Sequence, residues 1–196
     1  MPHVIHRITM RRQGRFVAAL AGALCALALA AQPSHAGVLV ASYAPAPDGG
    51  FEAGAKGWNL SGATVVADNE TYHVGGAGDD TSLRVPAGDS ATSPAFCVGL
   101  EHPTARFFAK RVGGSLLSTL RVDVEFEDAS GATHFLPVGV VALNAGSWQP
   151  SLPMLLVANL LPLLPGDHTP VALRFVPQGS GSWLVDDVYV DPFKRL

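Results

Sequence analysis

The sequence "LRVDVEFE", residues 120–127, carries the clearest structural signal in the chain. Apolar residues from Leu120 to Phe126 occupy every second position, and charged residues fill the positions between them. A period of two places all the apolar side chains on one face of a β-strand, whereas on a helix they would point in several directions. The sequence therefore predicts a strand here, with one face in a hydrophobic core and the other in solvent.

The segments around this strand also have a strand-forming composition. They are rich in β-branched and aromatic residues, and short turn signals with glycine separate them. The chain holds 21 glycines and 15 prolines, and no long stretch after residue 36 has a helical period. We therefore expect an all-β fold, an antiparallel β-sandwich with seven or more strands, and its size and strand spacing favour a jelly roll. The expected strands include residues 105–112, 133–143, 171–176 and 182–190.

Residues 1–36 have the features of a secretory signal peptide. A basic stretch precedes an apolar run at residues 16–31, and a Ser-His-Ala sequence at the end fits a cleavage site. The apolar run is short for a membrane-spanning helix, and no stop-transfer sequence follows it. We expect a secreted or extracytoplasmic protein with no membrane span and one β-sandwich domain at residues 37–196. Translation would start at Met1 or at Met10, which directly precedes the basic stretch.

The domain that follows the predicted signal peptide is acidic. All 16 Asp and Glu residues lie after position 36, whereas four of the 13 Lys and Arg residues lie before it. Binding to nucleic acid or to an anionic membrane requires a basic surface. The charge pattern therefore argues against these two classes of partner.

The predicted domain shows no catalytic signature. Its four histidines are scattered, with no pair at metal-ligand spacing and no His-Glu-x-x-His motif. It has no Gly-x-Ser-x-Gly nucleophile elbow and no phosphate-binding glycine loop that opens a helix. We therefore expect a non-catalytic protein. A hydrolase whose site is assembled only in the fold is an alternative, because two facing carboxylates are not visible in a linear sequence.

The end of the chain, "SWLVDDVYVDP" at residues 182–192, places carboxylates among apolar side chains. With strict alternation, Asp186 shares one strand face with Leu184 and Val188, while Asp187 lies on the opposite face, which is also apolar. An unpaired buried carboxylate is costly, so it must be paired, hydrogen-bonded or bound to a metal. Calcium suits such a place because it is a hard cation that takes carboxylate and carbonyl oxygens.

Five short motifs follow one another along the domain: Gly50-Phe51-Glu52, Gly57-Trp58, Ser82-Leu83-Arg84-Val85, Ser147-Trp148 and Val185-Asp186-Asp187-Val188. Their order, and their positions at both ends of one domain, resemble the galactose-binding-like jelly roll of carbohydrate-binding modules. The resemblance covers nearly the whole domain. It implies a β-sandwich that binds a glycan of the extracellular space or of the cell envelope.

The resemblance also implies a structural calcium ion. In this family, the glutamate after the first phenylalanine and the aspartate that opens the final "DDV" commonly hold the ion, which implies Glu52 and Asp186 as ligands here. Asp79 or Asp80, in the glycine-rich "GGAGDDTSL" sequence, is a further implied ligand. The alternative is that Glu52 accepts hydrogen bonds from backbone amides and pins the N-terminal strand with no metal.

For the glycan, the expected site is an exposed aromatic platform with polar groups beside it. Trp58 and Trp148 take positions that are usually in the core in this family, so we expect both to be buried. Tyr72 and His73, in the polar sequence "NETYHVGG", are the predicted ligand-binding residues.

Residues 152–164, "LPMLLVANLLPLL", form an apolar run that has two interpretations. In the first, a buried strand at residues 154–158 leads into an apolar loop. In the second, an exposed patch of leucines contacts a protein partner or a lipid surface, and the protein is an envelope-associated structural or protein-interaction domain. The leucines of that patch are Leu160, Leu161, Leu163 and Leu164.

Overall fold

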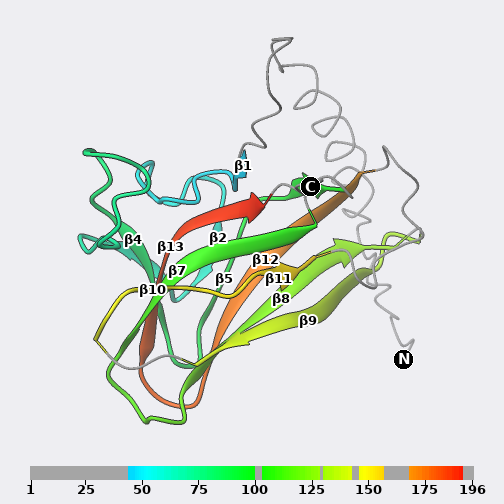
Figure 1. Ribbon diagram of the computed structural model, residues 1–196. Coiled ribbons are helices and arrows are strands. Elements are labelled where there is room, and N and C mark those ends of the chain that lie inside the picture. The colour runs from blue at the N-terminus through cyan, green and yellow to red at the C-terminus, as the bar shows by residue number, and fades with distance from the viewer. Residues whose placement is uncertain (1–43, 100–102, 129, 143–145, 157–167, 192–196) are drawn as a thin grey trace, which may run out of the picture.

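The computed structural model describes residues 44–99, 103–128, 130–142, 146–156 and 168–191 (Figure 1). The predicted signal peptide and the patch of four leucines lie outside these ranges. Every regular element within them is a strand, which confirms the predicted all-β fold. No helix in the described ranges is long and apolar enough to cross a membrane.

Two antiparallel sheets pack against each other as a sandwich, and Figure 1 shows them as two layers. We call the seven-stranded one sheet A and the six-stranded one sheet B. Sheet A contains β1 (Ala44–Pro45), β3 (Thr64–Val66), β4 (Ser82–Pro86), β7 (Thr104–Val112), β10 (Gln149–Pro150), β11 (Met154–Leu155) and β13 (Ser182–Asp191). Sheet B contains β2 (Asn59–Ser61), β5 (Ser90–Thr92), β6 (Phe96–Val98), β8 (Thr119–Glu127), β9 (Thr133–Val141) and β12 (Thr169–Gln178).

The strand order shows that neighbours in each sheet come from distant parts of the chain. Sheet A has the order β10-β7-β13-β4-β3, with β1 on β13 and β11 on β7. Sheet B has the order β2-β5-β12-β8-β9, with β6 on β12. The last strand of the chain, β13, therefore lies at the centre of sheet A, between β7 and β4.

The predicted strand at residues 120–127 is β8, which confirms the period-two interpretation. Leu120, Val122 and Val124 are completely buried between the sheets. On one side β8 pairs with β12, and on the other side it pairs with β9. The strand thus lies inside sheet B rather than at its edge.

Aromatic side chains fill the space between the two sheets. Phe107 from β7 and Phe175 from β12 meet edge to face, with their ring centroids 5.0 Å apart. Trp58 packs between Phe51, at 4.9 Å, and Phe175, at 6.1 Å. The predicted burial of Trp58 is confirmed, and the core ties the N-terminal segment to both sheets.

A second, smaller apolar cluster lies on the outer face of sheet A. It consists of Phe108, Trp148 and Leu184, all of them buried. Because neighbouring residues of a strand point to opposite faces, Phe107 enters the main core while Phe108 points outward. Trp148 is therefore buried as predicted, but outside the main core. Residues 67–80, which connect β3 to β4 and which we call the strap, lie over this outer face.

A β-bulge interrupts β13 after Asp186. The register between β13 and β7 shifts between Asp186 and Tyr189, and Asp187 has a φ of 46°. The extra residue reverses the facing of the side chains that follow it. Val188 therefore enters the main core, whereas Leu184 lies in the outer cluster. The predicted alternation, with Leu184, Asp186 and Val188 on one face, is wrong beyond Asp186.

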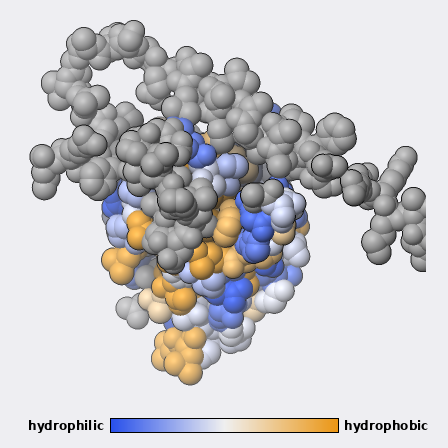
Figure 2. Space-filling view, turned by 90° about the vertical axis from the view of Figure 1, so that its right-hand side faces the viewer, coloured by the Kyte–Doolittle hydropathy of each residue, from blue (hydrophilic) through white to orange (hydrophobic). Residues whose placement is uncertain are grey.

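The turn between β7 and β8 carries two highly exposed leucines. Leu116 and Leu117 are 86% and 89% exposed. This turn lies at the lower end of the molecule in Figure 1, and apolar residues gather at the same end in Figure 2. Two apolar side chains therefore project into solvent at this end of the sandwich.

Candidate functional site

Three carboxylates meet where the strap lies against the bulge of β13. One carboxylate oxygen each from Glu70, Asp79 and Asp187 lies within 4.8 Å of the other two. Glu70 is 0% exposed and Asp79 is 3% exposed, so the strap buries both groups. The site therefore combines two residues from the strap with one from the central strand of sheet A.

The bulge brings Asp187 into this site. Asp187 occupies a left-handed backbone conformation, which is uncommon for a residue other than glycine. The backbone of the segment before Glu52 supports the bulge, because Val188 donates its N–H to Gly49 O at 3.0 Å and accepts that of Ala46 at 2.8 Å. A side chain at position 49 would place its Cβ only 2.4 Å from Val188 O, so the close approach requires glycine.

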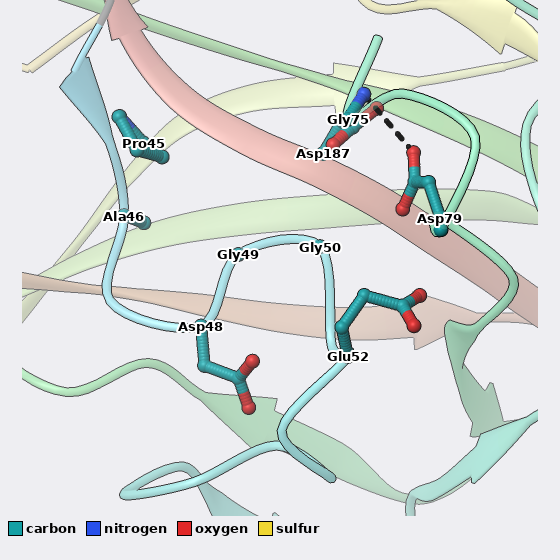
Figure 3. Close-up of a pocket in the computed structure, with 10 residues that line it drawn as sticks. Pro45, Ala46, Asp48, Gly49, Gly50, Glu52, Gly75, Asp79 and Asp187 are labelled. Carbon is teal, nitrogen blue, oxygen red and sulfur yellow. Dashed lines mark hydrogen bonds between the residues drawn. The ribbon is translucent and has the colours of Figure 1, made fainter. Parts of the chain in front are cut away.

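Backbone amides of the strap orient the two other carboxylates. Glu70 accepts hydrogen bonds from the N–H groups of Tyr72 and Val74, the latter at 2.7 Å. Asp79 Oδ2 accepts the N–H of Gly75 at 3.1 Å (Figure 3). The strap thus folds back on its own carboxylates, and the positions of Glu70 and Asp79 determine the path of the segment between them.

Glu52 lies beside the three-carboxylate cluster and holds the end of the strap. Its Oε1 accepts the N–H of Asp80 at 2.9 Å, and the N–H and Oγ1 hydroxyl of Thr81 at 2.7 and 2.9 Å. These bonds lower the pKa of Glu52, although desolvation opposes them as the largest single contribution. Glu52 therefore makes the backbone hydrogen bonds that the metal-free alternative predicts, and it also lines a pocket with Asp79 and Asp187.

The two remaining predicted metal ligands occupy different positions. Asp186 is completely buried on the outer face of sheet A, and its oxygens accept the N–H groups of Glu70 at 3.2 Å and of Asp187 at 2.8 Å. Asp80 is exposed, and its N–H is the group that Glu52 binds. Of the four predicted ligands, only Asp79 belongs to the three-carboxylate cluster.

The cluster carries excess negative charge. Burial, reinforced by the charge of Asp187, raises the pKa of Asp186 to about 8. Burial and the charges of Asp79 and Glu70 raise the pKa of Asp187 to about 7, and burial raises that of Asp79. Asp187 Oδ2 is a buried atom with no hydrogen-bond partner. A cation bound here would balance the charge of the carboxylates and would give Asp187 Oδ2 a partner.

The donor set fits a calcium ion. Calcium takes six to eight oxygen ligands from carboxylates and carbonyls in a flexible arrangement, and the cluster offers carboxylate oxygens only. A pocket of about 340 Å³ beside it is lined by glycines, acidic side chains, Pro45 and Ala46. In Figure 3 the Asp48 carboxylate points away from Asp79 and Asp187, which leaves it outside the donor set.

The predicted glycan-binding residues lie on the same strap. The Tyr72 ring is 57% exposed and stacks on Phe108 of β7, with centroids 5.0 Å apart and planes 29° apart. His73 is exposed next to it and has a φ of 50°. Since the Tyr72 N–H binds Glu70, the platform and the acidic cluster share one short piece of backbone.

An ion pair fixes the other end of the strap. Lys110 of β7 donates to both oxygens of Asp68, at 2.7 and 2.5 Å. The indole of Trp148 donates to Asp68 Oδ1 at 3.1 Å, and Lys110 Nζ lies 5.0 Å from the Trp148 ring centroid. The first part of the strap therefore contacts sheet A at three alternate residues, Asp68, Glu70 and Tyr72.

The outer face of sheet B offers a different surface. Phe135 of β9 is 49% exposed, and the Arg174 guanidinium lies 5.1 Å from the centroid of its ring. Asp123 is only 2% exposed and forms an ion pair with Arg121 at 2.9 Å. This face therefore supplies its own counter-charge.

Sequence reasoning did not identify Glu70 or Asp187 as members of the cluster. The "DDV" sequence contains Asp187, but the bulge that turns it toward the strap leaves no signal in the residue pattern. Glu70 stands two positions before Tyr72 in a polar segment, where an exposed side chain is the ordinary expectation. Only the pairing of segments more than 100 residues apart brings them together, as the 116-residue separation of Glu70 and Asp186 illustrates.

No protein-family model matches the sequence, and no curated protein sequence matches it. Several solved structures share its fold. The CBM22-1-GH10 modules of the Clostridium thermocellum endo-1,4-beta-D-xylanase 10B, complexed with xylohexaose, give a TM-score of 0.54 at 15% identity, over 79% of this chain and 28% of that chain. The CBM22-1 xylan-binding domain of Paenibacillus barcinonensis Xyn10C gives 0.53 at 16% identity, over 82% of this chain and 100% of that one.

A further xylan-binding domain, from CBM 22, gives a TM-score of 0.52 at 16% identity, over 81% of this chain and 99% of that one. At these identities the likeness concerns the fold. The chain has the galactose-binding-like jelly-roll fold of carbohydrate-binding modules, which confirms the resemblance seen in the sequence.

Proposed function

We propose that the protein is an exported, non-catalytic module that binds a glycan, with Tyr72 as the stacking platform and calcium as a structural ion. The observation that carries the proposal is the Tyr72 ring, which is exposed to solvent yet stacked on the buried ring of Phe108. The shared fold supports the proposal, but a fold does not by itself confer a function. The argument therefore rests on the properties of this surface.

The Tyr72 side chain has the properties that a sugar platform needs. Its ring offers an apolar face to the C–H groups of a pyranose, and its hydroxyl offers a hydrogen-bonding group at the edge. The stack on Phe108 orders the ring before a ligand arrives, which lowers the entropic cost of binding. The exposed His73 imidazole is the adjacent polar group.

Calcium is proposed to bind at the base of the strap. When bound, the ion would supply positive charge between Glu70, Asp79 and Asp187, its proposed side-chain ligands. Glu52 and Asp186, the ligands implied by the family resemblance, lie next to these three and hold the backbone amides around them. Asp80 contributes its backbone N–H to the same arrangement.

The burial of the carboxylates supports a binding role rather than hydrolysis. Most glycosidases use two carboxylates that flank a bound sugar, with room for the sugar between them. Glu70 and Asp79 belong to the strap, and both residues are almost inaccessible to solvent. A sugar ring therefore cannot enter between them while the strap is in place.

Calorimetric titration with oligosaccharides, in the presence of calcium, tests the proposal. Xylohexaose is the first probe because one structure of the same fold is complexed with it, and a glycan array extends the search to other sugars. The informative variant is Tyr72→Ala, which removes the platform. Its matched control is Phe135→Ala, which removes an aromatic side chain of similar exposure from the outer face of sheet B.

We expect at least about a fivefold loss of affinity in Tyr72→Ala, since one stacked aromatic contributes roughly 1 kcal/mol or more, and no change in Phe135→Ala. A loss of affinity in Phe135→Ala but not in Tyr72→Ala would place the glycan site on sheet B. Failure of the protein to bind any glycan of the array would contradict the proposed function itself.

A further inference from the structure

We propose that the cation site at the base of the strap controls the glycan platform, so that the two ligands bind cooperatively. The inference rests on the proposed function, and it assigns a regulatory role to the strap. The structural basis is that Tyr72 lies between Glu70 and Asp79 in a strap that is held to sheet A at few points.

The first step is the direct link between the carboxylates and the platform. Glu70 accepts the N–H groups of Tyr72 and Val74, and Asp79 accepts that of Gly75. The backbone of Tyr72 is thus hydrogen-bonded to a proposed metal ligand. A displacement of Glu70 away from Asp187 moves the Tyr72 backbone with it.

The second step concerns what holds the strap when no cation is present. Glu70, Asp79 and Asp187 place three carboxylate oxygens within 4.8 Å of one another, next to Asp186. Like charges at such distances repel strongly in a buried environment. Without a cation, the closed position of the strap therefore requires either the repulsion of these charges or the uptake of protons by the carboxylates, and a bound cation removes this cost.

The third step concerns the remaining attachments. The contacts of Asp68 with Lys110 and Trp148, and the hydrogen bonds of Asp80 and Thr81 to Glu52, stay available without a cation. The Lys110–Asp68 pair is partly exposed, with side-chain exposures of 15% and 38%, and such pairs contribute little to stability. Those contacts anchor the two ends of the strap, while the part between them, from Glu70 to Asp79, depends on the acidic cluster.

Two states of the strap follow. In the closed state Glu70, Asp79 and Asp187 surround the ion and Tyr72 lies on Phe108. In the open state the carboxylates separate and the platform is lost. Since the glycan binds only the closed state, calcium must raise the affinity for glycan, and glycan must raise the affinity for calcium by the same factor. A coupling of about 5-fold or more is the usual size of such an effect.

Hydrogen exchange of the full-length protein tests the strap without any glycan. We expect chelation of calcium with EGTA to speed exchange at the amides of Glu70, Tyr72, Val74 and Gly75 by about tenfold or more, and to leave the amides shared by β8 and β12 nearly unchanged. Asp187→Asn in calcium should behave like the chelated wild-type protein. The matched control is Asp128→Asn, which removes a carboxylate far from the strap in the sequence and should behave like the wild-type protein.

A second measurement tests the coupling. Calcium affinity is measured with and without xylohexaose, or with whichever array glycan binds, and glycan affinity is measured with and without calcium. Equal factors in both directions support the inference. Unchanged strap exchange upon chelation, or equal acceleration throughout the domain, would overturn it. Should Asp187→Asn fail to fold, the chelated wild-type protein still decides the exchange test.

The two parts of the account can fail separately. Strap exchange that depends on calcium, in a protein that binds no glycan, would contradict the proposed function and leave the ion-controlled strap in place. Glycan binding that is unaffected by calcium would contradict the inference and leave the proposed function intact.

Discussion

Two buried aspartates, Asp123 on the outer face of sheet B and Asp186 on the outer face of sheet A, have different electrostatic surroundings. On sheet B, Asp123 is buried and lies against Arg121, which contacts both of its carboxylate oxygens, at 2.9 and 3.1 Å. On sheet A, Asp186 is buried next to Asp187, and the charges that affect its pKa belong to other carboxylates. The comparison shows two ways to bury a carboxylate on an outer face of this fold. Asp123 is paired with an arginine of the same strand, whereas Asp186 lies among other carboxylates whose charge a bound metal ion would balance.

Chelation of calcium should have the largest effect, and it should act through sheet A. An ion present at about 1,000 times its dissociation constant stabilises a fold by about 4 kcal/mol, which corresponds to roughly 10 °C in melting temperature for a domain of this size. Differential scanning calorimetry with excess calcium and then with excess EGTA measures the difference. Asp187→Asn should have nearly the same melting temperature in both buffers. An unchanged melting temperature of the wild-type protein would contradict ion binding at sheet A.

Removal of the arginine on sheet B should have the next largest effect. Arg121→Met leaves Asp123 buried without its partner, and we expect a loss of about 2 kcal/mol, less than for a fully buried pair because Arg121 is 37% exposed. Urea unfolding measures the loss, which should be the same with and without calcium. The double variant Arg121→Met with Asp123→Leu should recover most of it. A loss that appears only in EGTA would show that the two faces are not independent.

The long strands of both sheets could be predicted because their signals are local. The alternation in β8 and the β-branched and aromatic residues of β7, β9, β12 and β13 are properties of a few neighbouring residues, and each of these strands is present. The facing of β13 could be predicted only as far as Asp186, since a bulge depends on how β13 pairs with β7.

The candidate site could be predicted only in part. The family resemblance implied Asp79 or Asp80 in the glycine-rich acidic segment, and Tyr72 was predicted because it is an aromatic residue in a polar loop. Glu70 and Asp187 were not, because the contact between the strap and β13 is set by the packing of distant segments. On sheet B, the predicted solvent exposure of the charged face of β8 is wrong at Asp123, which is 2% exposed and pairs with Arg121 two residues away in the same strand.

The pH dependence of stability offers a smaller effect that distinguishes the faces. The pKa values of Asp186 and Asp187, about 8 and about 7 in the fold, exceed the ordinary value of 3.8. The folded protein without calcium therefore binds more protons than the unfolded chain between about pH 4 and pH 8, and its stability should fall as the pH rises through this window. Melting temperatures measured in EGTA at several pH values check the sign.

Asp187→Asn is the control for this measurement, because it removes one of the two groups and should flatten the dependence. A melting temperature in EGTA that rises from pH 5 to pH 8 would contradict the raised pKa values. With calcium bound, the trend should reverse, because protons then compete with the ion for the same oxygens.

The smallest effect is expected at a third carboxylate, Asp128, which is held by hydrogen bonds and needs neither an arginine nor a metal ion. Asp128, in the exposed turn after β8, accepts the N–H groups of Ser130 at 2.8 Å and Ala132 at 3.0 Å, and its Oδ2 contacts the ring of His134. These hydrogen bonds, of which that from the Ser130 hydroxyl is the largest contribution, lower the pKa of Asp128. They therefore stabilise the fold at pH values above the ordinary pKa of an aspartate, and this stabilisation is lost as the pH falls. Asp128→Ala should therefore lower the melting temperature less than Arg121→Met does, equally in calcium and in EGTA, and with a difference from wild type that shrinks toward low pH. Glu127→Ala, the adjacent exposed carboxylate, is the charge-matched control, and a calcium-dependent effect of Asp128→Ala would mean that the acidic cluster on sheet A is not the only place where the ion acts.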